Sequence, residues 1–290
     1  MTTTLAPAIE APAIETPSRL RRFRVPVLIA GLAVVLVGTR GLNVVAAHNP
    51  ILALAMGFAT ATAAVYAYRW LNRKVEGRAT VDEVSSAGKW SGLRRGVLLG
   101  GAAFTTTLLI IGAFGGWDHV SGGSVSGFLI SLGAMMSVAV NEELLFRGVI
   151  FRILEERTGT VVAIVSSSLL FGLTHLVNPG ATLWGTLAIG IEGGTMLAVA
   201  YVLTRSLWLP IGLHFAWNFV GMGVFGTTIS GAPQENTSLM HTTLSGSDAL
   251  TGGAFGPEAS LIALMVCLSL TVVLLRRAVR AGQIRRRVAA

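Results

Sequence analysis

Long runs of apolar residues, separated by short polar segments, recur along the whole chain. A helix needs about 20 residues to cross a hydrocarbon core of about 30 Å, and eight stretches with almost no charge approach or exceed that length. Strands of a membrane barrel would alternate in polarity over about ten residues, and these runs do not. The pattern therefore predicts an all-α polytopic membrane bundle of about eight transmembrane helices, at 25–46, 50–68, 96–116, 125–149, 160–177, 182–204, 207–227 and 259–275.

The composition agrees with a membrane protein. Apolar residues make up 52% of the chain and charged residues 12%, about half the charged content of a typical soluble domain. The mean hydropathy is +0.69. The single cysteine, Cys267, excludes an internal disulfide and a thiolate metal cluster. These numbers favour an integral membrane protein.

The basic residues predict the orientation of the bundle. Of the 22 Lys and Arg residues, Arg40 alone, within the first predicted span, falls on the opposite side from the others. Short loops rich in Lys and Arg stay cytoplasmic, so both termini are expected in the cytoplasm, at the plasma membrane if the cell is bacterial. The net charge of +8 then follows from topology and from attraction to anionic lipid at the cytoplasmic face, and nucleic acid is not an expected partner.

Three charged residues lie at the end of the fourth predicted span, in the segment NEELLFRGVIF at 141–151. An ionised group at the centre of a bilayer costs about 3 kcal/mol on insertion scales. These side chains must therefore form ion pairs, be protonated, or face a hydrated cavity. Glu143 and Arg147 are four residues apart and are expected to form an ion pair on one helical face. Glu142 points about 100° away from that face and is left free, which makes it a functional candidate.

Two further polar pairs occur in later spans. The fifth span carries Phe171 and His175 in FGLTH, and the seventh carries His214 and Asn218 in HFAWN. Each pair has the spacing of one helical face. A single intramembrane histidine is as often a packing residue as a functional one, but two of them together with two glutamates favour a polar site.

The depth of the first two groups can be compared along the chain. Glu142 precedes Thr158 by 16 residues and His175 follows Gly159 by 16 residues, and the turn between the two spans is expected at this threonine and glycine. In an antiparallel helical hairpin, Glu142 and His175 would lie at the same height.

The three motifs together resemble a known family. EExxxR at 142–147, FxxxH at 171–175 and HxxxN at 214–218, in this order on separate spans, are similar to the CPBP family of CaaX prenyl endopeptidases and bacteriocin-processing proteases, also called Abi. The resemblance covers about 125–227. It implies that Glu142 activates a water with help from His175. It also implies the remaining roles: His214 and Asn218 stabilise the oxyanion, and Glu143 and Arg147 brace the site.

The resemblance leaves the metal open. The family is usually labelled a metalloprotease, but the chain has no HExxH. Carboxylates and imidazoles of the motifs are zinc ligands by type, and the sequence does not show that they converge. Zinc and no cofactor at all therefore both remain compatible with the sequence.

The resemblance and the predicted topology give a domain organisation. We expect a basic cytoplasmic tail at 1–24, disordered over 1–18, and a membrane domain at 25–275. Within that domain lie a catalytic core at 125–227 and an external loop at 228–258, which is rich in Gly, Ser and Thr and lacks Lys and Arg. A second basic cytoplasmic tail is expected at 276–290.

Two classes of function fit this sequence. The first is an intramembrane endopeptidase acting on a membrane peptide or a lipidated protein. The second is a non-enzymatic membrane protein, such as a transporter, an immunity protein or a scaffold, that keeps the polar cluster for ion handling or helix pairing. A transporter would be expected to show two matching halves, and since the chain shows none, the protease is favoured.

Three other acidic residues need an interpretation. Glu192, in the sixth span, could line the site or pair with Arg147. Glu155 and Glu156 lie among arginines at the turn and are expected to form a solvated face.

Overall fold

The computed structural model describes residues 22–232 and 238–286. It is mostly helical, as predicted, with one small two-stranded sheet. The α-helices are α1 Arg24–Ala46, α2 Pro50–Glu76, α3 Lys89–Ala113, α4 Val125–Leu145, α5 Arg152–Thr158, α6 Thr160–Leu173, α7 Leu183–Ile189, α8 Thr195–Thr204, α9 Trp208–Phe219, α10 Asp248–Thr251 and α11 Leu261–Arg280. The strands are β1 Trp117–Gly122 and β2 Met240–Leu244.

Shorter helical turns of two kinds interrupt these elements. Three are π-helical and continue a preceding α-helix: η3 Phe146–Phe151, η5 Gly190–Gly194 and η6 Val220–Phe225. The others are 3₁₀ turns: η2 Asp82–Val84, η4 Thr174–Val177, η7 Gly253–Phe255 and η8 Pro257–Ala259.

Seven helical segments of the described chain are long and apolar enough to span a membrane, which confirms a polytopic helical bundle. The segment predicted at 207–227 is α9 continued by η6, and it is not one of the seven. It carries His214 and Asn218, which lower its mean hydropathy. The polar residues that draw attention to this segment therefore also weaken its signal as a span.

Local sequence explains where the helices begin and end. Asn49 caps α2 by accepting hydrogen bonds from the amides of Ile51 and Leu52, both at 3.0 Å, and Pro50 follows at the first helical position, where its missing N–H costs nothing. Gly77 ends the helix with a φ of 69°, a conformation that glycine adopts without strain. A side-chain cap like that of Asn49 begins α4, where Ser124 Oγ accepts a hydrogen bond from the amide of Gly127 at 2.9 Å.

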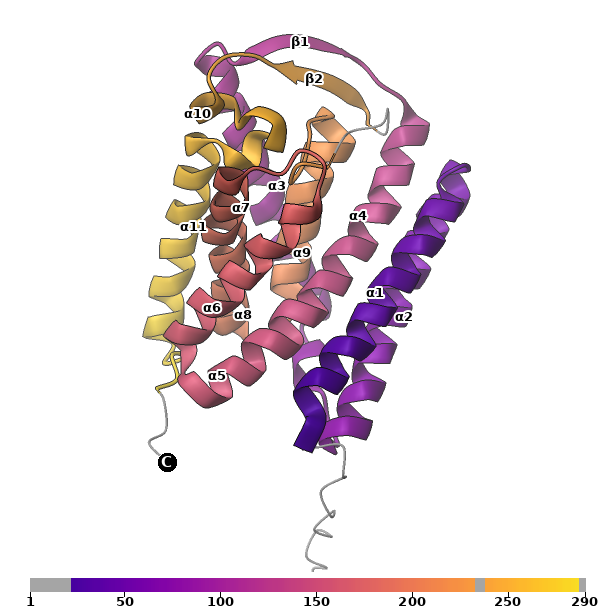
Figure 1. Ribbon diagram of the computed structural model, residues 1–290, viewed down its shortest axis with the longest axis vertical. Coiled ribbons are helices and arrows are strands. Elements are labelled where there is room, and N and C mark those ends of the chain that lie inside the picture. Colours follow the sequence, from indigo (N-terminus) through magenta and orange to yellow (C-terminus); the bar gives the residue numbers. More distant parts are fainter. Residues whose placement is uncertain (1–21, 233–237, 287–290) are drawn as a thin grey trace, which may run out of the picture.

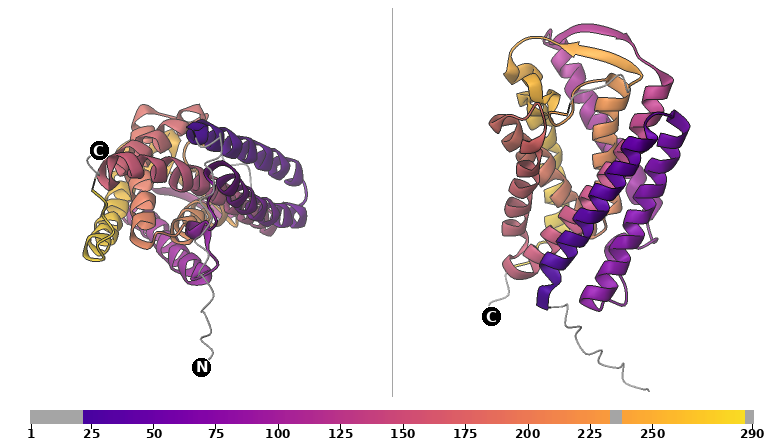
Figure 2. Two further views of the ribbon diagram at one scale, coloured as in Figure 1. Left: turned by 90° about the horizontal axis from the view of Figure 1, so that it is seen from below. Right: turned by 45° about the vertical axis from the view of Figure 1, so that its right-hand side comes forward.

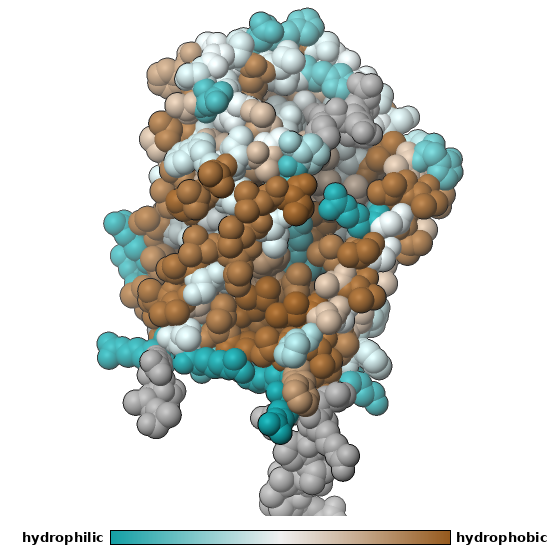
Figure 3. All heavy atoms as spheres, in the orientation of Figure 1, coloured by the Kyte–Doolittle hydropathy of each residue, from teal (hydrophilic) through white to brown (hydrophobic). Residues whose placement is uncertain are grey.

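The bundle has one strongly hydrophilic end. Hydrophilic residues gather at the bottom of Figure 3, below a broad hydrophobic band. The start of α1 and the end of α11 both lie at this end (Figures 1 and 2). Arg24, at the start of α1, forms an ion pair with Glu156 of α5 at 2.5 Å. The amide of Thr160 donates to the carbonyl of Arg285, beyond α11, at 3.0 Å, so the α5–α6 turn belongs to the same end.

The acidic pair at the α5–α6 turn is not a solvated face. Glu155 is buried because it accepts hydrogen bonds from Thr160 Oγ1 and from Arg205 after α8, both at 2.5 Å. Only Glu156 keeps substantial exposure, at 34% of its side chain. The sequence could not place Arg205, which is 50 residues away in the chain.

Helix α9 is enclosed by its neighbours. Every residue from Trp208 to Asn218 is buried. Glycines let α3 approach α9 closely, since a Cβ at Gly100 would lie 2.2 Å from the carbonyl oxygen of Leu213, and one at Gly96 would lie 2.3 Å from that of Leu209. Small residues at such contacts are the usual basis of tight helix packing in membranes, and here they fix the helix that carries His214.

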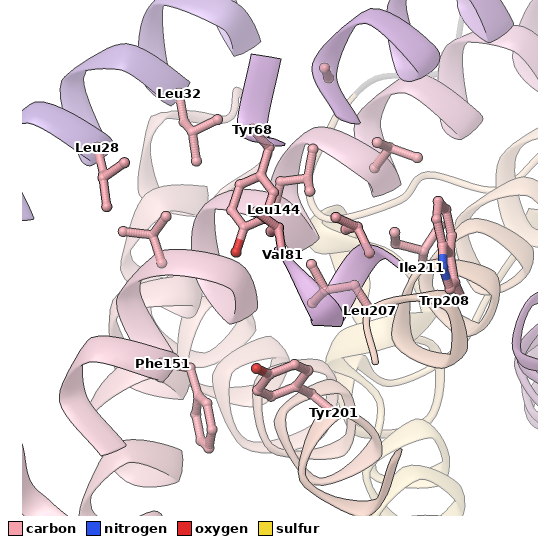
Figure 4. Close-up of a cluster of buried hydrophobic side chains, with 14 of the residues drawn as sticks. Leu28, Leu32, Tyr68, Val81, Leu144, Phe151, Tyr201, Leu207, Trp208 and Ile211 are labelled. Carbon is pink, nitrogen blue, oxygen red and sulfur yellow. The ribbon is translucent and has the colours of Figure 1, made fainter. Parts of the chain in front are cut away.

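A hydrophobic cluster joins α1, α2, α8 and α9 (Figure 4). The ring of Tyr68 packs among Leu28, Leu32 and Leu144, while its hydroxyl donates to Glu83 and, at 2.9 Å, to the carbonyl of Gly148. The glycine is needed there, because a Cβ at position 148 would lie 2.8 Å from the tyrosine ring. This cluster anchors the segment that follows the acidic pair of α4.

The opposite end of the bundle is capped by an antiparallel β-ribbon. β1 pairs with β2, with Val120 opposite Thr242 and Ser121 opposite His241, and the ribbon arches over the helix ends in Figure 1. Part of this cap comes from the predicted loop at 228–258. That segment is more than a surface loop, because Glu258 is buried and its side chain accepts a hydrogen bond from Trp217 Nε1 at 2.7 Å.

The described residues include only part of the two predicted cytoplasmic tails. The expected disorder at 1–18 lies outside the described residues, as do 287–290. At the other boundary, α11 continues to Arg280, so the first residues of the segment predicted as a tail at 276–290 are helical.

Candidate active site

Helix α4 carries the two adjacent glutamates into the interior of the bundle. Glu143 is fully buried, whereas the side chain of Glu142 is 23% exposed. Immediately after them the helix widens into the π turn η3, and such turns are frequent at functional sites. The two neighbouring carboxylates therefore have different environments, one enclosed and one accessible.

The ion pair predicted between Glu143 and Arg147 is present. Arg147 NH1 donates to Glu143 Oε1 at 2.8 Å, and both side chains are almost completely buried. Arg147 NH2 donates to the carbonyl of Gly194 at 3.0 Å, and the guanidinium lies 4.7 Å from the centre of the Phe171 ring. Arg147 thus connects α4 to α6 and to the end of η5.

His214 of α9 reaches both glutamates. Its Nδ1 lies 2.9 Å from Glu143 Oε1, and its Nε2 lies 3.8 Å from Glu142 Oε2. An ionised carboxylate only accepts hydrogen bonds, so Nδ1 carries a proton and Nε2 is directed toward Glu142. The motifs at 142–147 and 214–218 therefore meet in space.

His175 lies in the 3₁₀ turn at the end of α6. Its Nδ1 is 2.9 Å from the carbonyl oxygen of Phe171, which fixes the proton on Nδ1 and leaves a lone pair on Nε2 when the ring is neutral. The Phe171 ring separates the two histidines, with its centre 4.9 Å from the His175 ring and 6.0 Å from the His214 ring. Among the described residues, no contact within 4.0 Å joins His175 to Glu142, whose nearest imidazole is His214.

A small cavity lies beside these residues. His175, His214 and Asn218 line it together with Glu192, and its volume of about 20 Å³ is enough for about one water molecule. Asn218 follows His214 by one helical turn on the same face of α9. The structure thus brings Glu142 and the Glu143–Arg147 pair to His214, and it places His175, His214 and Asn218 at the cavity, which Glu142 does not line.

Two further cavity residues come from the segment predicted as an external loop. Ser230 and Glu258 line the cavity, and Glu258 Oε2 accepts hydrogen bonds from the Ser230 amide and, at 2.8 Å, from its hydroxyl. A weak signal for Glu258 was present in the sequence, since a lone acidic residue directly before an apolar span needs a partner.

A comparison with protein-family models gave one match. Residues 124–220, about a third of the 290 residues, match the family described as Type II CAAX prenyl endopeptidase Rce1-like. Over this segment, called the CPBP segment below, the chain is similar to the CPBP family. Searches among curated proteins and among solved structures gave no match. The CPBP segment contains all six candidate residues, and its similarity to this family suggests an intramembrane protease of the CAAX type.

The described part of the CPBP segment and its surroundings do not fit a metal ion. Across residues 22–232 and 238–286, no three His, Cys, Asp or Glu side chains are grouped so that they could hold one. Glu143 Oε1 is already shared by Arg147 and His214, whereas a catalytic zinc normally takes three protein ligands. The proposed hydrolysis therefore uses the side chains of the chain itself.

Proposed function

We propose that the protein is an intramembrane endopeptidase that hydrolyses a peptide bond of a prenylated or otherwise membrane-associated substrate. One observation carries the proposal: the accessible Glu142 and the buried Glu143 of α4 meet His214 of α9, inside an apolar bundle and beside a cavity. The CAAX description of the matching family supports the substrate class.

In this proposal Glu142 is the general base. Its carboxylate takes a proton from a water while the water oxygen attacks the carbonyl carbon of the scissile bond. The lone pair on His175 Nε2 orients the water, because Nδ1 is occupied by the carbonyl of Phe171. General-base assistance of this kind is worth about 10²–10⁴ in rate.

The developing oxyanion is stabilised from α9. The side-chain amide of Asn218 donates to it, and so does His214 Nε2 in the cationic form of the ring. These donors are preorganised, because α9 is buried from Trp208 to Asn218 and His214 Nδ1 is fixed by Glu143. Removing one such donor typically costs about 10²–10³ in rate.

Glu143 and Arg147 act through the other residues. Glu143 orients the His214 ring, and Arg147 neutralises Glu143 while it holds the carbonyls of η5. Buried charges need partners of this kind to be tolerated. Both are positioning residues in this scheme.

Substrate reaches the site from within the membrane. Glu142 is partly exposed and His175 is half-buried. Figure 3 shows hydrophilic spheres inside the hydrophobic band, in the region between α4 and α6. A lipid-anchored segment could approach through this side, while the basic end of the bundle faces anionic lipid of the cytoplasmic leaflet.

The test uses membranes containing wild-type protein, the Glu142→Gln form or the Asn218→Ala form at equal folded amounts. Quantitative proteomics would search for peptides cleaved in the presence of the wild type only. We expect Glu142→Gln to abolish this cleavage and Asn218→Ala to slow it by about 100-fold. Cleavage at the wild-type rate by Glu142→Gln would refute the proposal.

A further inference from the structure

Glu192 is a buried acid at the cavity that the scheme above does not use. It lies in the π turn η5, its exposure is 1%, and it lines the cavity with His175, His214 and Asn218. A π turn shifts the direction of the side chains around it relative to a regular helix, and such turns are frequent at functional sites. Glu192 thus shares a cavity with three of the residues in the proposed catalytic scheme.

One carboxyl oxygen of Glu192, Oε2, is buried without a hydrogen-bond partner in the described part of the chain. Arg147, the partner that the sequence allowed, binds Glu143 and the carbonyls of the two glycines after Glu192 instead. Within the same residues no Lys, Arg or His forms an ion pair with Glu192. A buried carboxylate without a partner is costly enough that the group stays protonated.

Its neighbour Glu258 has the opposite environment. Trp217 Nε1 donates to one carboxylate oxygen at 2.7 Å, and the amide and hydroxyl of Ser230 donate to the other. Three donors satisfy an ionised carboxylate. The negative charge of Glu258, at the same cavity, further disfavours a second charge on Glu192. The two carboxyl groups at the cavity therefore differ: Glu258 accepts from three donors, whereas Glu192 has no ion-pair partner in the described residues.

We propose that Glu192 is the acid that protonates the leaving amine, an assignment that rests on the proposed endopeptidase activity. When the C–N bond of the tetrahedral intermediate breaks, the electron pair goes to nitrogen, which takes the proton of the Glu192 carboxyl group. The proton that Glu142 received from the attacking water is released to solvent, and Glu192 takes up a proton from water in its cavity. The sum is one water consumed, with one new carboxyl group and one new amine.

The experiment separates this step from the attack of water by changing the leaving group. The probes are an acylated farnesyl-cysteine tripeptide amide, whose amine must be protonated to leave, and the corresponding acyl farnesyl-cysteine p-nitrophenyl ester, whose phenolate leaves without a proton. Purified wild type and Glu192→Gln are assayed on both. The ratio of the two rates within one preparation does not depend on the fraction folded.

We expect Glu192→Gln to lower turnover of the peptide by about 100-fold and to change turnover of the ester by less than twofold. Glu142→Gln should lose both activities. Glu258→Gln, the matched control in the same cavity, should lower both by the same factor, because it disturbs Trp217 and Ser230 rather than a proton transfer.

Two outcomes would overturn the assignment. An unchanged peptide-to-ester ratio in Glu192→Gln would show that Glu192 delivers no proton. If the wild type cleaved neither probe and no membrane peptide, the proposed function would fail, and this inference with it. Hydrolysis of both probes by the wild type with an unchanged ratio in the variant would overturn the inference alone.

Discussion

Glu143 Oε1 lies 2.9 Å from Nδ1 of His214, although 71 residues separate the two in the chain. The same oxygen accepts from Arg147 at 2.8 Å. One buried carboxylate therefore joins α4 to α9 and sets the orientation of the imidazole that faces Glu142. This arrangement distinguishes the two adjacent glutamates.

Glu143→Gln should reduce the amount of folded protein. The substitution leaves the buried guanidinium of Arg147 without its counter-charge, which typically costs about 3–5 kcal/mol. Glu142→Gln is the matched control, because that side chain is partly exposed and its nearest basic group lies 3.8 Å away. Folded protein after detergent extraction, measured by size-exclusion chromatography, should fall for Glu143→Gln alone. Equal amounts of the two variants would contradict the structural role of Glu143.

Gly100→Ala should disturb the site from a distance. The new Cβ would lie 2.2 Å from the carbonyl oxygen of Leu213, the residue before His214, so α3 and α9 must separate. Gly101→Ala is the control, since its Cβ would meet only Val220 Cγ2 at 3.7 Å. We expect a lower melting temperature and at least tenfold slower cleavage for Gly100→Ala, and neither change for Gly101→Ala. Wild-type behaviour of Gly100→Ala would show that the approach of α3 to α9 is not required.

Lowering the pH should reduce the stability of the hydrophilic end of the bundle, because Glu83 becomes protonated. Burial by itself would raise the pKa of Glu83, but hydrogen bonds from Arg78 and Tyr68 outweigh it and hold the pKa below its ordinary value near 4.5. Arg78 binds both carboxylate oxygens, at 2.6 and 2.7 Å. Because the folded pKa is lowered, this stabilisation is complete above the ordinary value and is lost as pH falls through the folded one.

The corresponding variant is Glu83→Gln, with the exposed neighbour Asp82→Asn as control. At neutral pH we expect Glu83→Gln to cost about 2 kcal/mol of unfolding free energy, less than for a fully buried pair because Arg78 is partly exposed. The difference in melting temperature from wild type should stay constant above the ordinary pKa near 4.5 and shrink as the pH falls below it. A difference that stays constant down to about pH 3 would argue against this titration.

Chelation should leave cleavage unchanged. The described carboxylates and imidazoles do not form a three-ligand group, and Glu143 is committed to Arg147 and His214. Protein purified in mild detergent would be analysed for metal content per chain and assayed before and after a chelator. Stoichiometric zinc, with activity lost on removal and restored on addition, would refute this expectation and assign ligand roles to the same residues.

The orientation can be tested with single cysteines. Cys267 is buried, so the thiol reagent should not label the native cysteine. A cysteine at Ser245, beside the β-ribbon, should react with an impermeant thiol reagent added to intact cells, and one at Ala87, before α3, should not; both positions are exposed. The reverse labelling pattern would place both termini outside.

The apolar runs were sufficient to predict the helical bundle, because a membrane leaves few alternatives to a helix for an uncharged segment. The spacing of Glu143 and Arg147 predicted their ion pair, because that contact is local. The six candidate residues could be named from three short motifs, but their contacts across helices could not be derived. The proximity of His214 to both glutamates depends on how α9 packs against α4.

Other features depended on contacts that leave no local pattern. β1 and β2 are short, and they pair across more than 100 residues, so neither segment shows the alternation of an independent strand. The burial of Glu155 depends on Arg205, and the environment of Glu192 depends on Glu258 from a different segment. The π turns after Glu143 and Asn218 also escaped prediction, because one extra residue in a turn does not change the apolar content of a span.

The enclosure of α9 has a consequence for how the chain enters the bilayer. A helix whose residues from Trp208 to Asn218 all face protein gains little from contact with lipid, and it carries a histidine and an asparagine that lipid would not solvate. Its place in the membrane is therefore stabilised chiefly by α3, α4 and α8, which are all synthesised before it. Ribosome-bound chains that stop after α9 has left the ribosome should already protect His214 from solvent-borne reagents, before α11 is synthesised.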